Sequence, residues 1–194
     1  MITPLIGRGQ DGLMTQLDDM TSIDKVTGGN PDAFRDIVTR YQRPLFVYIG
    51  NIVRHRQTAE DMLQDVFLAV YVHLDSYQRQ KGNFSTWLFQ IARNRCLNEL
   101  KKKKERLEPD LVDIPGPDSP VEALMKKEAF RQLDEAMNQL SFRDLSIFIL
   151  AELEGMSYEE ISRIEKIRMG TVKSRLSRIR KKLKGLLEKQ GKRP

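Results

Sequence analysis

The stretch "MSYEEISRIEKIRMGTVKSRLSRIRKKL", residues 156–183, decides how the second half of the chain folds. Ser157 and Glu160 stand three positions apart, which is the spacing of a capping box that opens a helix. A short turn follows this helix, and a longer basic helix begins near Met169. Two helices joined by a short turn are typical of a helix-turn-helix, whose second helix enters the major groove of DNA.

The second helix of this motif separates apolar positions from basic ones. From Met169 to Leu187 it extends about 28 Å at 1.5 Å per residue, enough to cross a groove about 12 Å wide. The charges alone leave open the alternative of a basic helix that is merely solvated. The apolar stripe consists of Val172, Leu176, Ile179 and Leu183, and the side chains off the stripe that are free to contact bases or phosphates are Lys173, Ser174, Ser177 and Arg178.

The basic charge of the chain is concentrated in two segments. The 194 residues carry a formal net charge of +6. Residues 157–194 contain thirteen Lys or Arg against four Asp or Glu, so the preceding residues sum to −3. A second basic run, residues 93–106, has seven Lys or Arg against two acids. Two basic segments in one chain predict two separate contacts with DNA.

The composition argues against several classes of site. With Cys96, His55 and His73 as its only cysteine and histidines, the chain can build neither a disulfide framework nor a Cys/His zinc site. We expect no metal, no cofactor and no catalytic centre. No apolar run approaches the roughly 20 residues that span a bilayer, and the first twenty residues lack the apolar core of a signal peptide. We therefore expect a cytoplasmic protein that is not a membrane protein.

The first half of the chain also has helical periodicity. Asn30 and Ser85 are the expected N-caps of two of its helices. Three amphipathic helices of this length are able to share one core. They are expected from Asn30 to Ile52, from Ala59 to Leu74 and from Ser85 to Leu100 with a charged extension to Arg106.

The segment "LEPDLVDIPGPDSP", residues 107–120, contains four prolines and four acids, which predicts an extended linker. Helical signals return at Val121, and no alternating run predicts a sheet. The expected fold class is all-α, with two small helical domains joined by a flexible linker. The expected segments are an N-terminal tail at 1–19, a first domain at 20–106, the linker at 107–120, a helix-turn-helix domain at 121–187 and a C-terminal tail at 188–194.

The helix "AEDMLQDVFLAVYVHL", residues 59–74, places Asp61, Gln64 and Asp65 on one face at positions i, i+3 and i+4. Acids in the first turns also favour the helix dipole, so the spacing alone leaves both a solvated face and a partner surface open. A carboxylate-pair catalytic site is disfavoured because no histidine or phosphate-binding glycine loop accompanies the acids.

The segment "GNFSTWLFQIARNRCLNELKKKKER", residues 82–106, begins with aromatic residues typical of a core and continues into polar ones. Trp87 is the expected core anchor. Asn94, Arg95 and Asn98 then extend from the core toward four consecutive lysines, which predicts an electropositive surface in the first domain.

Four segments together resemble the extracytoplasmic-function sigma factors, the small initiation subunits of bacterial RNA polymerase. They are "PDAFRDIVTRY", "AEDMLQDVFLAVY", "FSTWLFQIARN" and residues 156–183, in the order and separation of that family, and the resemblance covers about residues 20–187. It implies a protein without catalytic residues that binds core polymerase, directs it to promoters and helps open the DNA. It also implies activation of an alternative regulon that responds to stress or to the cell envelope.

The resemblance further implies partners and site residues. The partners are core RNA polymerase, through the β′ clamp and the β subunit, promoter DNA and an anti-sigma protein; the linker acids would mimic the charge of nascent RNA. The loop Asp75–Asn83, one residue longer than in some relatives, would capture an extruded base. The implied residues are Asp61, Gln64 and Asp65 for core polymerase, Ser76, Tyr77, Asn94, Arg95 and Asn98 for the minus-ten element, and Thr171, Lys173, Ser174, Arg175, Ser177 and Arg178 for the minus-thirty-five element.

Two other functions compete with this interpretation. A stand-alone helix-turn-helix regulator would bind DNA without polymerase, but it usually carries a ligand or receiver domain of alternating strands and helices, which residues 20–106 do not indicate. An enzyme acting on nucleic acid would need an active site, and the sequence supplies none.

Overall fold

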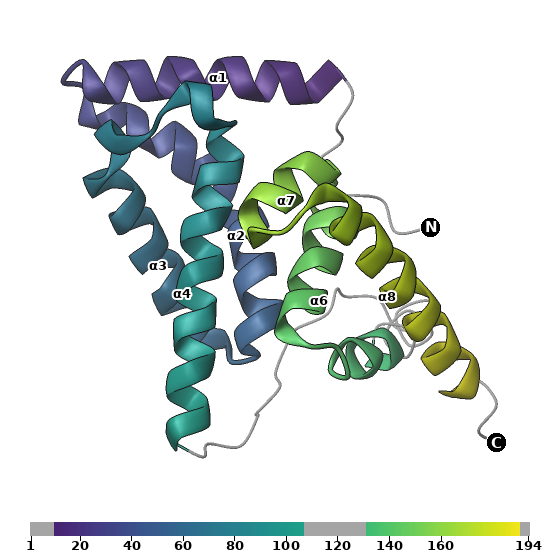
Figure 1. The fold of residues 1–194 in the computed structure, drawn as a ribbon. Coiled ribbons are helices and arrows are strands. Elements are labelled where there is room, and N and C mark those ends of the chain that lie inside the picture. Colours follow the sequence, from purple (N-terminus) through teal and green to yellow (C-terminus); the bar gives the residue numbers. More distant parts are fainter. Residues whose placement is uncertain (1–9, 107–130, 191–194) are drawn as a thin grey trace, which may run out of the picture.

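The computed structural model describes residues 10–106 and 131–190, and every regular element in these two ranges is helical (Figure 1). No strand occurs in them, which confirms the predicted all-α class. The predicted linker at 107–120 and the start of the helix predicted from Val121 lie outside the described residues.

Helix α1, Gln10–Thr27, occupies much of the segment predicted as a tail at residues 1–19, so that prediction is wrong from Gln10 onward. The helix is anchored by Asp19, which is 2% exposed, accepts a hydrogen bond from Tyr41 Oη at 2.6 Å and pairs with Arg40 at 2.5 Å. Burial raises the pKa of Asp19, against the opposing effects of Tyr41 and Arg40. The anchor is polar and its partners are distant in sequence, so apolar periodicity gave no signal for it.

Helices α2, α3 and α4 pack around one core, as predicted. Aromatic rings meet edge to face at its centre: Tyr41 with Phe84 at 5.8 Å between centroids, and Tyr48 with Phe89 at 5.4 Å. All four rings are buried. The helices span Phe34–Val53 for α2, after a 3-10 turn at Pro31–Ala33, Arg56–Val72 for α3 and Phe84–Arg106 for α4.

One of the two predicted caps is in place. Asn30 is the N-cap of the 3-10 turn that leads into α2, with Pro31 at its first position, although the Asn30 side chain makes no cap bond. Ser85 is a buried residue inside α4 rather than its cap. Helix α3 begins three residues before Ala59, because the His55 ring accepts the N–H of Thr58 at 3.2 Å. Histidine is not among the preferred N-cap residues, so the pattern placed this start too late.

The second half consists of short helices followed by a long one (Figure 1). Residues 131–137 are helical, in the stretch after Val121 where the sequence predicts a return of helical structure. The predicted C-terminal tail at 188–194 is wrong for its first three residues, because they continue the last helix; residues 191–194 lie outside the described ranges. The elements are α6 at Phe142–Phe148, a π-helical segment at Ile149–Leu153, α7 at Tyr158–Glu165 and α8 at Met169–Gln190.

The predicted capping box opens α7. The Glu160 N–H donates to Ser157 Oγ at 3.3 Å, and the Ser157 N–H donates to Glu160 Oε2 at 2.9 Å. Two of the N–H groups that a helix start leaves without partners are thereby satisfied.

We expect Ser157→Ala to lower the free energy of unfolding by about 1 kcal/mol, because it removes the cap acceptor. Chemical denaturation followed by circular dichroism measures the change. Ser177→Ala, at an exposed position in the interior of α8, is the control and is expected to cost nothing. Equal denaturation midpoints for Ser157→Ala and the unmodified chain would contradict the energetic role of the box.

The two halves of the chain pack directly on each other, with α4 against α7 and α2 against α6 (Figure 1). Their buried apolar residues form one continuous cluster. No pattern in the sequence predicted this interface, because its two sides are about seventy residues apart.

Candidate nucleic-acid interface

The helix-turn-helix is formed by α7, a sharp turn and α8. Helix α7 ends at Glu165 and is followed by Lys166, whose φ of 53° places it in the left-handed conformation that often terminates helices. Helix α8 begins three residues later, at Met169. All four residues of the predicted apolar stripe of α8 are buried, which confirms that this side of the helix packs against the rest of the protein. They are Val172, Leu176, Ile179 and Leu183.

The opposite side of α8 faces solvent. Arg175 and Arg180 are paired with acids of the preceding elements, Arg175 with Asp144 at 2.8 Å and Arg180 with Glu152 at 2.6 Å. The hydrogen bond to Glu152 raises the pKa of Arg180. All four side chains of α8 that were predicted to contact bases or phosphates are exposed. They are Lys173, Ser174, Ser177 and Arg178.

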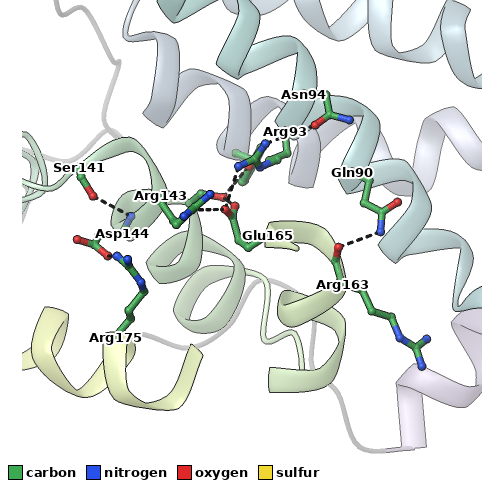
Figure 2. Close-up of polar contacts among 11 residues, drawn as sticks. Gln90, Arg93, Asn94, Ser141, Arg143, Asp144, Arg163, Glu165 and Arg175 are labelled. Carbon is green, nitrogen blue, oxygen red and sulfur yellow. Dashed lines mark hydrogen bonds and ion pairs between the residues drawn. The ribbon is translucent and has the colours of Figure 1, made fainter. Parts of the chain in front are cut away.

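The remaining two positions predicted for this interface are less accessible. Thr171 is half-buried, and its main-chain oxygen accepts a hydrogen bond from Ser174 Oγ at 3.1 Å. Arg175 is also half-buried and turns toward Asp144, at the start of α6 (Figure 2). A phosphate contact by Arg175 therefore requires it to exchange Asp144 for the phosphate.

The acidic face predicted on α3 is exposed. Asp61 accepts a hydrogen bond from Gln57 at 3.2 Å, and Asp65 pairs with Arg95 at 3.3 Å, both at the surface. Gln64 is exposed beside them. The pair of Asp65 and Arg95 joins a residue predicted to contact polymerase to one predicted to contact DNA.

Helix α3 also exposes apolar side chains that our sequence reasoning missed. Leu68 and Val72 are each 62% exposed, and they continue the row that contains Asp61 and Asp65 at helical spacing. The signal was present in the sequence, since both positions fall off the buried stripe of this helix. The acidic face therefore runs into an apolar surface toward the C-terminal end of α3.

The loop between α3 and α4 holds Tyr77 in an aromatic cluster. Its ring lies 5.5 Å from that of Phe84 and 5.6 Å from that of Trp87, and its hydroxyl donates to the main-chain oxygen of Gly82 at 3.0 Å. Burial raises the pKa of Tyr77. Ser76 next to it is exposed. Tyr77 thus braces the loop against α4.

Three polar residues on α4 were predicted to belong to the same minus-ten site as this loop. Asn94 and Asn98 are exposed one turn apart, and Arg95 is half-buried in its pair with Asp65. Arg93, which our sequence reasoning counted only as a charge, is buried and donates to Asn94 Oδ1 at 3.4 Å (Figure 2). These three predicted residues lie further along α4 than Phe84 and Trp87, the residues of this helix that contact Tyr77 of the loop.

Two other kinds of site are absent from residues 10–106 and 131–190. No group of three or more His, Cys, Asp or Glu side chains there has the arrangement of a metal site. None of the helices in these ranges combines the length and apolarity needed to cross a membrane.

Comparison with known proteins identifies both halves. Residues 37–106 match sigma-70 region 2, and residues 130–183 match sigma-70 region 4. The ECF RNA polymerase sigma-E factor of Escherichia coli K12 is 33% identical over 177 residues, which cover 85% of this chain and 92% of that protein. The chain belongs to the extracytoplasmic-function sigma factors. As a sigma factor it binds core RNA polymerase and promoter DNA and initiates transcription, and it is not an enzyme.

Other comparisons agree with this assignment. The RNA polymerase sigma-H factor of Pseudomonas aeruginosa is 29% identical to this sigma factor over 190 residues, 91% of this chain and 97% of that protein. The sigma factor RpoE of Bartonella quintana, solved with the anti-sigma factor NepR, superimposes with a TM-score of 0.67 at 25% identity, over 80% of this chain and 96% of that one. The alternatives of a stand-alone regulator and of an enzyme are therefore set aside.

Proposed function

We propose that this sigma factor reads the minus-thirty-five promoter element as duplex DNA with α8. The observation that carries the proposal is the exposed face of α8, which lies opposite the buried stripe and is preceded by the capped helix α7. Arg178 and Lys173 donate to guanine edges, and Ser174 and Ser177 contact bases or phosphates. Thr171 and Arg175 belong to the same surface, with Arg175 on a phosphate.

The acidic face of α3 binds core polymerase in this proposal. Asp61, Gln64 and Asp65 dock on the basic clamp helices of the β′ subunit, and the β subunit provides a second contact. Support comes from the exposure of all three side chains and from the complementary charge. The exposed Leu68, next along the row, extends the same contact with apolar area.

The minus-ten element is bound as single-stranded DNA by the loop and α4. Ser76, Tyr77, Asn94, Arg95 and Asn98 line this site, where an extruded base is held by stacking and by an amide that reads its edge. In the free protein the Tyr77 ring packs edge to face against Phe84 and at a tilt against Trp87, so Tyr77 supports the loop that holds the base.

The same proposal assigns the domains and the biological role. Residues 20–106 bind polymerase and the minus-ten element, and residues 121–187 bind the minus-thirty-five element. The protein acts in the cytoplasm on an alternative regulon that responds to stress or to the cell envelope, and an anti-sigma protein restrains it. The structural likeness to RpoE bound to NepR supports such a partner.

Transcription with purified core polymerase on a library of genomic fragments tests the function directly. We expect the sigma factor to initiate at a small set of fragments that share minus-thirty-five and minus-ten sequences. Core polymerase alone is the control. Initiation at fragments that share no promoter sequences would contradict the proposal. So would a level of transcription no higher than that of core polymerase alone.

We expect Asn94→Ala to weaken binding to single-stranded minus-ten oligonucleotides about tenfold, because the contact to one base edge is lost. Binding to duplex minus-thirty-five DNA is expected to stay the same, since Asn94 is on the other half. Fluorescence anisotropy with both probes measures the two affinities, and Asn138→Ala, an exposed asparagine of the second half, is the control. Equal losses of affinity for both probes would indicate that Asn94 stabilises the fold and does not contact the base.

A further inference from the structure

The two ion pairs that join α8 to the preceding elements differ in geometry. Arg180 makes two contacts with one carboxylate oxygen of Glu152, from Nε at 2.8 Å and from Nη2 at 2.6 Å. Arg175 contacts Asp144 Oδ1 from Nη1 at 2.8 Å, while its Nε is buried and has no hydrogen-bond partner among the described residues. A buried donor without an acceptor costs free energy, so the pair of Arg175 and Asp144 is the less satisfied of the two.

Arg175 also borders a small hollow beside α8. The hollow has a volume of about 100 Å³, and two apolar residues, three cations and one carboxylate line it: Leu140, Ile179, Arg175, Arg178, Lys182 and Asp144. The three cations stand at positions i, i+3 and i+7, which lie on one side of a helix. Positive charge therefore exceeds negative charge around this hollow, and such a surface attracts an anion.

A backbone phosphate of DNA fits Arg175 better than the Asp144 carboxylate does. The planar guanidinium matches phosphate oxygens through two parallel N–H bonds. An acceptor placed across this fork would satisfy the buried Nε that Asp144 leaves without a partner. Thr171, one turn before Arg175, belongs to the same proposed DNA surface, so a phosphate here would lie along the path of the duplex.

Asp144 is able to release Arg175 without becoming a buried, unpaired charge. Its side chain is 28% exposed, so water solvates the carboxylate when Arg175 turns away. Asp144 lies in the first turn of α6, where the helix dipole favours an acid. Its N–H donates to Ser141 Oγ at 3.3 Å and does not depend on Arg175 (Figure 2). The exchange therefore leaves α6 intact.

We propose that Asp144 takes the place of a DNA backbone phosphate on Arg175 in the free sigma factor and competes with that phosphate for Arg175 when a duplex binds. The proposal rests on the proposed contact of α8 with the minus-thirty-five element. Every duplex presents phosphates, whatever its bases, so every duplex must displace Asp144. Asp144 thus lowers the affinity for all duplexes alike and leaves the preference among bases unchanged.

The first test measures the affinity of the full chain for two duplexes of equal length by fluorescence anisotropy. One duplex carries the minus-thirty-five sequence that transcription selects, and the other carries the same bases in shuffled order. Asp144→Asn keeps the size of the side chain and removes its charge. We expect this variant to bind both duplexes about fivefold more tightly, because a half-exposed ion pair no longer has to be broken. The ratio of the two affinities should stay the same.

Glu152→Gln is the matched control, since Glu152 is also 28% exposed and also pairs with an arginine of α8. We expect it to leave both affinities unchanged, because Arg180 does not line the hollow. Asp144→Asn should also give no gain in a chain that carries Arg175→Ala, because the competition needs Arg175.

Two results of these titrations would overturn the competition. A gain of equal size from Glu152→Gln, or from Asp144→Asn in the Arg175→Ala chain, would mean that any loss of negative charge near the DNA has the same effect. Weaker binding by Asp144→Asn would mean that Asp144 orients Arg175 toward the DNA.

The second test follows the exchange in the unmodified chain by nitrogen-15 NMR of arginine side chains. The Nε–H signals of Arg175 and Arg180 are assigned with Arg175→Lys and Arg180→Lys. On addition of the promoter duplex we expect the Arg175 signal to shift and the Arg180 signal to stay in place. An Arg175 signal that does not move in the complex would overturn the exchange, even if Asp144→Asn does not fold.

The two duplexes distinguish this inference from the proposed function. If the unmodified chain binds neither duplex, or binds both equally, the proposed reading of the minus-thirty-five element by α8 fails. If the chain prefers the promoter duplex but gains no affinity from Asp144→Asn, only the role of Asp144 fails.

Discussion

The double variant Asp61→Lys, Asp65→Lys is expected to bind core polymerase at least about a hundredfold more weakly while keeping the helicity and melting temperature of the unmodified chain. Reversing two charges against a basic surface replaces attraction by repulsion, and like charges across an interface cost several kcal/mol. A hundredfold loss is about 2.7 kcal/mol, well within that range. Co-purification with core enzyme and a binding titration measure the loss.

The fold should tolerate this double variant because both carboxylates are outside the core. Among the described residues, the ion pair it breaks is Asp65–Arg95, whose side chains are 61% and 39% exposed, and exposed pairs contribute about 0 to 1 kcal/mol. Asp18→Lys with Asp32→Lys makes the same change of net charge at exposed positions outside α3, and we expect it to bind core enzyme normally. Undiminished binding by the folded Asp61, Asp65 variant would remove α3 from the polymerase interface.

The second large effect concerns sequence preference on α8. We expect Arg178→Ala to reduce discrimination at one or two positions of the minus-thirty-five element by roughly 1–3 kcal/mol, because a bidentate contact to a guanine edge is lost. Discrimination here is the ratio of affinities for the preferred and the substituted base. A binding titration against a library of minus-thirty-five duplexes at several salt concentrations measures it.

Lys181→Ala is the matched variant for this experiment. Lys181 is exposed on the same helix, and a phosphate contact there contributes affinity without base preference. Loss of this contact should weaken binding to all DNA sequences alike and reduce the slope of log K against log salt by about one unit. If Arg178→Ala, Lys173→Ala and Ser174→Ala all keep the original preference, α8 is only an electrostatic surface and the bases are read elsewhere.

Much of the helix-turn-helix was predictable because its determinants are local. A capping box needs two residues three positions apart, and a buried stripe needs apolar residues at helical spacing; the sequence displays both at Ser157, Glu160 and along α8. The exposure of Lys173 and Arg178 follows from the same periodicity. The N-terminal helix α1 was missed because Asp19, buried against Tyr41 and Arg40, holds it through polar partners more than twenty residues away.

The sequence by itself determined the all-helical class, the buried and exposed sides of α3 and α8, and the family, since each depends on periodicity or on short motifs in order. Only the tertiary structure decided that the two halves close on each other. Arg93 and Glu165 are 72 positions apart, and neither carries a local mark of burial. A charged side chain becomes stable in the interior only when its partner arrives from another element, and that arrival is a property of the packed chain rather than of any segment of it.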